Sequence, residues 1–564
     1  MATLKQEETT TTERGTSQVS DISTPPPEKS LGVQPVDLER LGEEQGYALD
    51  ETVLKQHLGL SPDAVLKKSP KGVVLIPQPS DDPRDPLNWS VWKKRSILIM
   101  LALASFTCDY SAATGASALL AQAAQWHISP NVVNHATAGN TFMLGIGGLL
   151  TVWFSAFFGR LPVIFAFGIL GSATAIWSAA AQTFESYMAS RILNGLFVVA
   201  AAGGGLMWIN DVFFFHERPR VINLWSTFII LSPFLGPQFM AAVLQVASWR
   251  VGMYLNFGIL TLSLLTIIAL GEETFYPRHK KPIEIPDIYS APRWQRLLGI
   301  QQTKTRYTGN TFIGAGSRTA MTASRIPVIL ICLFYFFDFG WTIGNNTTIS
   351  VILVPAYKLN YYGLAAVYVA PLIGGLLNLP VGYFLFDIVG KLWAKRHNGI
   401  IEPEARLIPL WIVLPFKIVG YNLIGLTISR HWNIYILCFG WVSSSPLPPF
   451  TPLAPQSSSA DIMCVQAMHN LTTILTTAAV SSYLIDAYPE ASGESAAWLN
   501  FARTLAGFVV GYIQLTWATA AGVEKEYGIQ TAIMGVAFVV FVIPLTILGG
   551  RLRKVQGPLK FKTN

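Results

Sequence analysis

Long apolar segments separated by short polar ones fill most of the chain after about residue 95. A transmembrane helix needs about 20 predominantly apolar residues. Eleven segments meet this requirement without interruption: 96–119, 136–158, 162–181, 186–212, 220–245, 250–271, 326–350, 361–386, 407–428, 497–519 and 528–549. A further span starts near residue 433 and is interrupted. The pattern predicts an all-α membrane protein with six spans, a polar loop and six further spans.

The first 80 residues contain no such segment and are rich in Thr, Ser, Glu, Pro and Gln. This composition cannot bury enough apolar surface to fold alone, so we expect a disordered tail with a weak helix near residues 48–58. The predicted units are the tail with its juxtamembrane segment (1–92), a first half (93–272), a central loop (273–325), a second half (326–550) and a final tail (551–564).

The tenth span is interrupted by residues 442–466, which contain several prolines and a serine tract. Such a sequence cannot continue a transmembrane helix. Joining Trp441 directly to Ala467 gives one continuous span from Ile434 to Ile485. We therefore predict that residues 442–466 are an aberrant insert, a translated intron whose codons can encode splice-like signals. A genuine insertion or a re-entrant loop is the alternative.

Charged residues make up 13% of the chain, compared with about 25% in soluble domains. The net charge is +7, but the basic residues gather in short loops beside apolar segments. This distribution is typical of membrane topology rather than of nucleic-acid binding, and it predicts that both termini and the central loop are cytoplasmic. We expect a multi-pass protein of the plasma membrane or, alternatively, the vacuolar membrane. The four cysteines show neither metal-ligand nor disulfide spacing, so no metal or cofactor is expected.

Ionisable side chains inside a span are costly and usually mark a transport pathway. Asp109 in the first span and Arg191 in the fourth lie at depths that differ by about 7–8 Å, at a rise of about 1.5 Å per residue. An arginine side chain can cover that difference. We expect the two residues to form a pair that couples proton binding to transport. A structural ion pair, or an Asp109 that faces a water-filled vestibule, is the alternative.

Asp338 lies in the seventh span among aromatic residues, between Phe337 and Phe339. Carboxylates in the first and seventh spans would be equivalent if the halves are repeats, and the rings could surround a flat or cationic substrate. Aromatic packing around a carboxylate bonded to a neighbouring helix explains the same residues. The other residues predicted to line a substrate cavity are Asn194, Asn345, Asn346, Lys417, Asn470 and Arg503.

Glycines punctuate the connections between spans in both halves. Gly159 and Arg160 form a tight basic turn between the second and third spans. Asp387 and Gly390 occupy the matching connection between the eighth and ninth. The same punctuation in both halves predicts a duplicated architecture.

The fourth and fifth spans carry further motifs, from Arg191 to Gly195 and at Gly236-Pro237. With the Gly159-Arg160 turn, these motifs give a chain that resembles the major facilitator superfamily, specifically its fungal twelve-helix drug:proton antiporter-like members. The resemblance covers about residues 84–556. It implies two pseudo-symmetric six-helix halves and links the arginine of the fourth span to proton coupling.

The resemblance also assigns gating or motif roles, and it has departures. The gating and motif residues it implies are Gly159, Arg160, Gly195, Gly236, Pro237, Asp387 and Gly390. The acid usual in the loop between the second and third spans is replaced by Ala156. Phe239 and Met240 occupy the region where two glycines are expected after Pro237, which weakens the case for export over import.

These features predict a secondary active transporter, with proton-coupled efflux of a small amphipathic organic compound such as a drug, toxin or fungal secondary metabolite. The alternative is a proton-coupled importer of a nutrient or an organic cation such as a polyamine. A receptor or a membrane enzyme would need motifs that we do not find in a plausible context. The expected partners are the substrate, protons and the lipid bilayer, with no nucleic acid, and the protein is expected to be a monomer.

Overall fold

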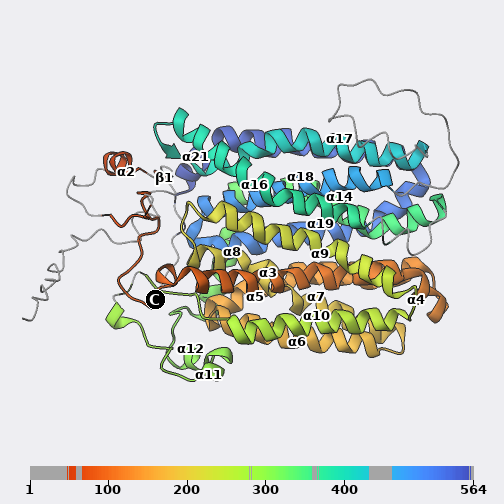
Figure 1. Ribbon diagram of the computed structural model, residues 1–564, viewed down its shortest axis with the longest axis horizontal. Helices are drawn as coiled ribbons and strands as arrows, with labels where there is room; N and C mark the ends of the chain where they lie inside the picture. The colour runs from red at the N-terminus through yellow and green to blue at the C-terminus, as the bar shows by residue number, and fades with distance from the viewer. Residues whose placement is uncertain are drawn as a thin grey trace, which may run out of the picture.

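The computed structural model describes residues 47–48, 50–58, 66–70, 72–278, 280, 282–357, 365, 368–430, 460–557 and 559. Long helices lie side by side and form two layers, one from each half of the chain (Figure 1). Both the first described residues and the end of the last helix lie at the same end of the bundle, which we call the base. The prediction of an all-α membrane protein is confirmed.

The first half contains six spans, of which the first and fourth are built from more than one helical segment. Its elements are α3 (Val91–Ala113), η2 (Thr114–Ala118), α4 (Leu119–Trp126), α5 (Pro130–Phe158), α6 (Arg160–Ala180), α7 (Phe184–Val198), α8 (Ala200–Val212), α9 (Arg218–Val243) and α10 (Trp249–Leu270). Ser90, Ser129 and Thr183 accept backbone N–H bonds at the starts of α3, α5 and α7, as helix-capping residues do.

The second half has the same plan. Its elements are α14 (Ile326–Tyr357), α16 (Val369–Arg396), η4 (Pro403–Leu407), α17 (Ile408–Arg430), α18 (Ala460–Ala487), η6 (Pro489–Ala491), α19 (Ser492–Ala521), α20 (Val523–Ala537), η7 (Phe538–Val542) and α21 (Ile543–Gln556). Among the described residues, eleven helical segments are long and apolar enough to cross a membrane. They correspond to the eleven uninterrupted spans that the sequence predicts.

The remaining long helix, α18, is the described part of the tenth span. It packs between α16 and α17 and also meets α9. Its 28 residues span about 42 Å at about 1.5 Å per residue, so α18 alone is long enough to cross a membrane. The predicted insert lies mainly outside the described residues, at 442–459, whereas its last seven residues belong to α18. The intron hypothesis stays a prediction.

Prolines and a glycine of α9 shape its contacts with neighbouring helices. Pro237 has no N–H group, so the carbonyl four residues earlier, at Pro233, loses its intrahelical donor. Asn346 of α14 supplies a replacement, because its Nδ2 donates to Pro233 O at 2.8 Å. At Gly236 a Cβ atom would lie 2.6 Å from Tyr110 O, so this glycine permits the close contact between α9 and α3. The motif Gly236-Pro237 thus joins α9 to both halves.

The central loop folds at the base as η3 (Pro282–Glu284), α11 (Arg293–Leu297), α12 (Ile300–Lys304) and α13 (Phe312–Ala323). The segment before the first span also packs there, as α2 (Glu51–Leu58), η1 (Pro86–Asn88) and β1 (Tyr47–Ala48). β1 pairs antiparallel with β2 (Ile400–Ile401) of the second half. α2 agrees with the predicted helix near 48–58. The described residues between 47 and 80 differ from the predicted disorder. Their apolar side chains are buried against residues of both halves.

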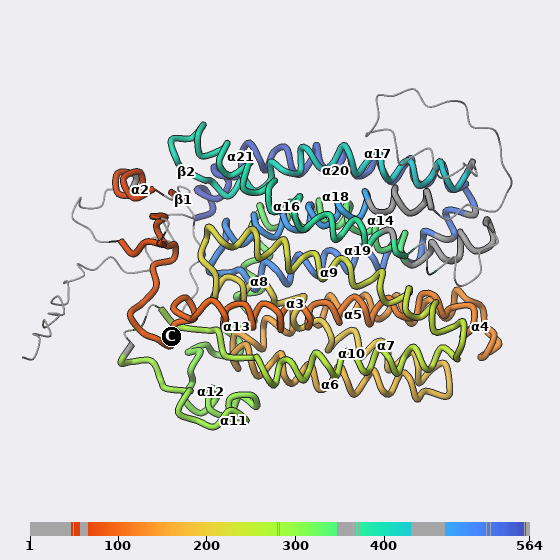
Figure 2. Tube along the Cα trace, in the orientation of Figure 1, coloured from red at the N-terminus to blue at the C-terminus, as the bar shows by residue number. Residues whose placement is uncertain are grey.

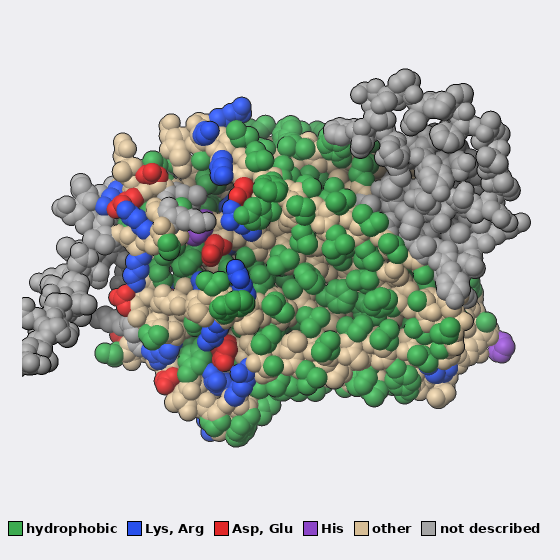
Figure 3. Space-filling view, in the orientation of Figure 1, with side chains coloured by type: hydrophobic (Ala, Val, Ile, Leu, Met, Phe, Trp, Pro, Cys, Tyr) green, Lys and Arg blue, Asp and Glu red, His purple; other side chains and the backbone are tan. Residues whose placement is uncertain are grey.

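The surface divides into an apolar belt and a charged base. Hydrophobic side chains cover the long middle of the visible face, and charged ones gather at the base, on the left (Figure 3). Exposed leucine, isoleucine, valine and phenylalanine side chains occur on most of the spans. Such a belt is typical of a surface that faces lipid rather than water.

Candidate functional site

A cavity lies between the two halves, with about 540 Å³ of empty space that includes space open to solvent. Its walls come from α3, α5 and α9 of the first half and from α14 and α19 of the second. Most of the lining is apolar, with a few convergent polar groups, which is typical of small-molecule sites. The polar lining residues are Asp109, Thr137, Thr141, Thr342, Asn346, Arg503 and Thr504.

Asp109 and Arg503, the two charged residues of this lining, bind each other across the halves. Arg503 Nη1 lies 2.5 Å from Asp109 Oδ2, and Nη2 lies 3.3 Å from Oδ1. Arg503 also donates to Asn500 Oδ1 at 2.9 Å, and its guanidinium lies 5.3 Å from the centre of the Phe339 ring. Asp109 accepts a weak bond from the Cys108 thiol. Arg503 would therefore keep its contacts with Asn500 and Phe339 if the Asp109 carboxylate were removed.

The expected pair between Asp109 and Arg191 is not formed, because each residue has another partner. Arg191 is fully buried and donates to Ser111 O at 2.7 Å and to Ala112 O at 2.6 Å. α3 ends at Ala113, and carbonyls in the last turn of a helix lack intrahelical donors. Arg191 satisfies two of them. It therefore fixes the end of the helix that carries Asp109.

Asn194 and Gly195 hold α7 against its neighbours and do not belong to the cavity lining. Asn194 Nδ2 donates to Gly171 O at 3.0 Å, and its Oδ1 accepts from Ser111 Oγ at 2.7 Å. At Gly195 a Cβ atom would lie 2.3 Å from Asn140 O. Asn194 was predicted to line the cavity; in this structure its amide instead connects α7 to α3 and α6.

Asp338 and Lys417 form a second ion pair, inside the second half. Lys417 Nζ lies 2.5 Å from Asp338 Oδ2, and neither side chain is exposed. Both were predicted to line the cavity, but neither belongs to its described lining. The pair instead matches the alternative given above, in which the carboxylate of Asp338 is bonded to a neighbouring helix, here α17. One turn further along α14, Thr342 does reach the cavity, and its Oγ1 lies 3.2 Å from His469 Nε2.

The three predicted asparagines of the second half have different positions. Asn346 lines the cavity. Asn345 faces the interior of the second half, where its Oδ1 accepts from Tyr527 Oη at 2.7 Å. Asn470 donates to Pro371 O at 2.6 Å and connects α18 to α16. Only Asn346 among them therefore contributes to the described cavity lining.

A second cavity lies between the halves on the base side of Arg503 and holds about 340 Å³ of empty space. Its walls come from α8 and α9 of the first half and α14, α18 and α19 of the second, and include Trp225, Tyr335, Thr477 and Ser481. Arg503 lines both cavities. The pair that it forms with Asp109 therefore lies at the boundary between them.

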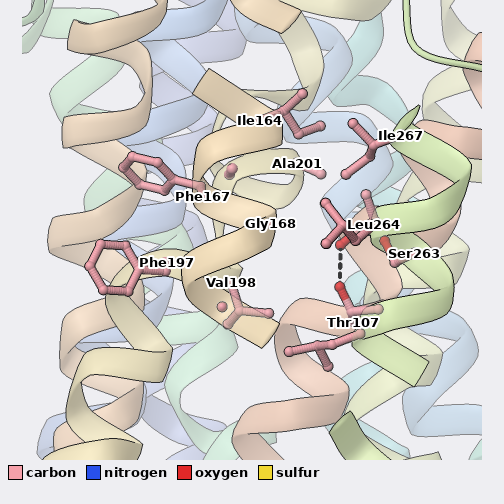
Figure 4. Close-up of a pocket in the computed structure, with 14 residues that line it drawn as sticks. Thr107, Ile164, Phe167, Gly168, Phe197, Val198, Ala201, Ser263, Leu264 and Ile267 are labelled. Atoms are coloured by element: carbon pink, nitrogen blue, oxygen red, sulfur yellow. Dashed lines mark hydrogen bonds between the residues drawn. The ribbon is translucent and has the colours of Figure 1, made fainter. Parts of the chain in front are cut away.

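A third cavity lies within the first half, among α3, α6, α7, α8 and α10, with about 320 Å³ of empty space that includes space open to solvent (Figure 4). Its side chains include Ile164, Phe167 and Leu264, and its described lining contains no ionisable group. The Thr107 hydroxyl donates to Ala104 O within its own helix. This cavity offers apolar volume but no group that could couple substrate to an ion.

The Gly159-Arg160 turn at the base is built around a carboxylate from outside the motif. Glu273 accepts from the backbone N–H groups of Arg160 at 3.1 Å and Leu161 at 3.2 Å, at the start of α6. Gly159 has φ +98°, and a Cβ there would lie 2.6 Å from Glu273 Oε2. Arg160 also pairs with Asp211 at 2.8 Å. Burial raises the pKa of Glu273, opposed by these N–H bonds.

The matching motif of the second half differs. Asp387 binds Arg220 of α9 in a bidentate pair, with distances of 3.2 and 2.5 Å, and so connects the halves at the base. Gly390 lies inside α16, which continues to Arg396, so the connection between the eighth and ninth spans begins later than predicted. A Cβ at Gly390 would meet nothing within 4 Å. The first half therefore has the turn, at Gly159, without the acid of the motif, and the second half has the acid, Asp387, without the turn.

Comparisons with known proteins place the chain among membrane transporters. An uncharacterised MFS-type transporter of Schizosaccharomyces pombe is 24% identical, with 91% of this chain and 94% of the relative covered. Protein HOL1 of Saccharomyces cerevisiae is 24% identical, with 88% and 92% covered. The citrinin biosynthesis cluster MFS transporter mrr1 of Monascus ruber is 23% identical, with 84% and 90% covered.

Solved structures share the fold. The proton:xylose symporter XylE superposes with a TM-score of 0.54 at 15% identity, over 81% of this chain and 96% of that one. The human organic anion transporter MFSD10 gives 0.52 at 13% identity, over 80% and 100%. The family model of the Major Facilitator Superfamily matches residues 99–511. The chain therefore belongs to the major facilitator superfamily of membrane transporters.

Proposed function

We propose that this transporter exports a small amphipathic organic compound in exchange for protons, with the 540 Å³ cavity as its binding site. The observation that carries the proposal is the Asp109–Arg503 pair, which lines the cavity and joins the two halves. A carboxylate at this position can hold either a negative charge that binds Arg503 or a proton. Its protonation state is therefore linked to the attraction between the halves.

The proposed coupling step is proton transfer to Asp109. The neutral carboxyl loses most of its attraction for Arg503, and the guanidinium keeps its bonds to Asn500 and its contact with Phe339. In a site of low dielectric the lost attraction is larger than in water. Alternating access by movement of one half against the other is then favoured by protonation at one side of the membrane and by proton release at the other.

The cavity walls support an amphipathic organic substrate. Ile230, Phe234 and Phe339 supply apolar and aromatic surface, whereas Thr137 and Asn346 supply a hydroxyl and an amide. One relative carries the name of a biosynthetic cluster transporter, which supports export of a metabolite. A cytoplasmic position of both termini is part of this proposal and is supported by the basic residues that gather at the base. Location in the plasma membrane is proposed with it.

Import of a nutrient or an organic cation by the same pair is the alternative. Import is favoured by the presence of Phe239 and Met240 where two glycines are expected after Pro237. In the family that the chain resembles, that glycine pattern is typical of antiporters. Cells expressing the protein and incubated with ethidium, a lipophilic cation, distinguish the directions. Depletion relative to cells without the protein supports export, and accumulation supports import.

The binding site is tested with purified full-length protein in vesicles that carry a pH gradient and ethidium. Thr141→Phe fills part of the cavity and should lower gradient-driven ethidium transport by about tenfold or more, equivalent to about 1.4 kcal/mol. Leu265→Phe, which enlarges an exposed side chain on the lipid-facing surface, should leave transport unchanged. Equal transport by wild type and Thr141→Phe would place the substrate elsewhere.

A further inference from the structure

The described residues from 47 to 89, which we call the N-terminal strap, cross the base and contact both halves. Figure 2 shows this segment, in red, running from the start of α3 towards β1 and β2. Its buried side chains include Leu54, Leu66, Val74 and Ile76, each at most 7% exposed. A segment that buries this much apolar surface is held in place by the folded transporter.

The strap binds the second half through β1. Tyr47 pairs with Ile401 and Ala48 with Ile400 in an antiparallel register. Tyr47 Oη donates to Asp486 O at 3.1 Å, at the end of α18. β2 and the end of α18, which are far apart in sequence, therefore both hold the same end of the strap.

The strap binds the first half through its later residues. Phe215, between α8 and α9, donates its N–H to Ile76 O at 2.8 Å. Tyr276 Oη donates to Asp82 Oδ2 at 3.0 Å. Burial opposes the charged form of the Asp82 carboxyl, but hydrogen bonds from Arg84 and Tyr276 outweigh it and lower the pKa of this group. These contacts keep the later part of the strap on the first half.

The two sets of contacts meet at Phe215. This ring belongs to the first half, is 1% exposed and stacks on Tyr47 with a centroid distance of 4.1 Å. The Arg406 guanidinium of the second half lies 5.1 Å from the centre of the same ring. Ile401 and Ala405 of the second half belong to the same apolar cluster. Phe215 is therefore a side chain of one half inserted between the strap and the other half.

We propose that the strap and Phe215 form a latch that holds the base closed. Separation of the halves at the base must withdraw Phe215 from Tyr47 and Arg406, which exposes an aromatic ring and ends a cation–π contact. The cavity on the base side of Arg503 is reached only after this step. The latch goes beyond the proposed function, because it acts whichever ion or substrate the transporter uses.

Access to the base-side cavity tests the latch without a known substrate. Ser481 lines that cavity and is buried. In full-length protein whose four native cysteines are replaced by serine, Ser481→Cys is reacted with N-ethylmaleimide in detergent. Phe215→Ala and Tyr47→Ala should each raise the labelling rate by about threefold to tenfold, as expected for loss of one buried aromatic pair. Unchanged rates in both variants would overturn the latch.

A matched control is the neighbouring ring, Phe214. It lies over Lys94 of α3 at 4.6 Å and stacks on His216, both in the first half. Phe214→Ala should therefore leave the labelling rate of Ser481→Cys at its original value. A rise equal to that of Phe215→Ala would mean that any aromatic deletion loosens the base, and the latch would be rejected.

A cross-link tests the same idea without removing any contact of Phe215. Ala48 and Ile400 are register partners, and facing strand residues approach closely enough for a disulfide. In Ala48→Cys/Ile400→Cys, oxidation should lower the labelling of Ser481→Cys several-fold, because the strap can no longer leave the second half, and dithiothreitol should restore it. Adding Phe215→Ala should abolish the effect of oxidation. Equal labelling of oxidised and reduced protein would contradict the latch.

Discussion

Arg503 has a different environment from the other buried cations of the spans. It lines two cavities and contacts the side chains of Asp109, Asn500 and Phe339. In contrast, Arg191 binds backbone carbonyl groups, and Lys417 is fully buried within the second half. A cation that borders open space beside a carboxylate can exchange its partner, but a fully enclosed one cannot do so cheaply. On this basis we propose that Arg503 takes part in coupling, whereas Arg191 and Lys417 stabilise the fold.

The sequence identified these ionisable residues because charge inside an apolar span is rare. It did not identify their partners. Depth along a helix can be counted from the sequence, but rotation about the helix axis and the order of helices in the bundle cannot. Asp109 and Arg191 have compatible depths, yet Arg503, 394 residues from Asp109 in sequence, faces the carboxylate. Thr137 and Thr141 were missed because hydroxyls four residues apart also occur in ordinary helix packing.

The Asp338–Lys417 pair should be a structural element of the second half. Lys417→Met leaves a buried carboxylate without its partner and should lower the free energy of unfolding by roughly 3–5 kcal/mol. Asp338→Leu combined with Lys417→Met removes both charges and should recover most of this loss. Thermal unfolding midpoints of the detergent-purified proteins give the comparison, and a double variant no more stable than the single one would contradict this role.

At the scale of elements, most helices follow directly from the apolar segments, and the exceptions have physical causes. α16 continues through Gly390, since the acid and glycine of the second motif fit a helix as well as a turn. α18 begins earlier than the apolar pattern indicates. The turn at Gly159 was recognised, but its stabilising carboxylate, Glu273, comes from 113 residues away along the chain.

The Gly159 turn makes a quantitative prediction. Gly159→Ala forces a side chain into a positive φ and against Glu273, which should cost roughly 1–3 kcal/mol of stability. Gly390→Ala is the matched control, because its site is helical and open, and it should be neutral or slightly stabilising. Unfolding midpoints measured side by side check the difference, and equal midpoints for the two variants would show that the turn tolerates a side chain.

The interrupted tenth span gives a further prediction, for a segment that lies mainly outside the described residues. If residues 442–466 are a translated intron, the mature transcript should lack their codons, and protein made without them should transport more. Sequencing the transcript checks the first expectation. A mature transcript that retains the segment would contradict the intron hypothesis and favour a genuine insertion.

At the scale of the whole molecule, the two six-helix halves and the charged base follow from hydropathy and from the placement of Lys and Arg. The strap does not, because its composition is typical of a tail and its binding surfaces lie near residues 215, 400 and 486. A polar segment can remain ordered when the rest of the protein supplies the apolar surface that it lacks. Contacts between the halves therefore include the Asp109–Arg503 pair, the bond from Asn346 to Pro233 O, the Arg220–Asp387 pair and the stacking of Phe215 on Tyr47 of the strap.

In the proposed mechanism, Asp109 exchanges a proton as the halves move. Purified wild type, Asp109→Asn and Glu185→Gln, an exposed carboxylate of α7 used as the control, are reconstituted into vesicles containing ethidium and a pH-sensitive dye. A pH gradient should drive ethidium movement with an opposite proton flux in wild type and Glu185→Gln. In Asp109→Asn both fluxes should lose their dependence on the gradient while the protein stays folded. Gradient-driven transport by Asp109→Asn at the wild-type rate would show that Asp109 does not couple protons to transport.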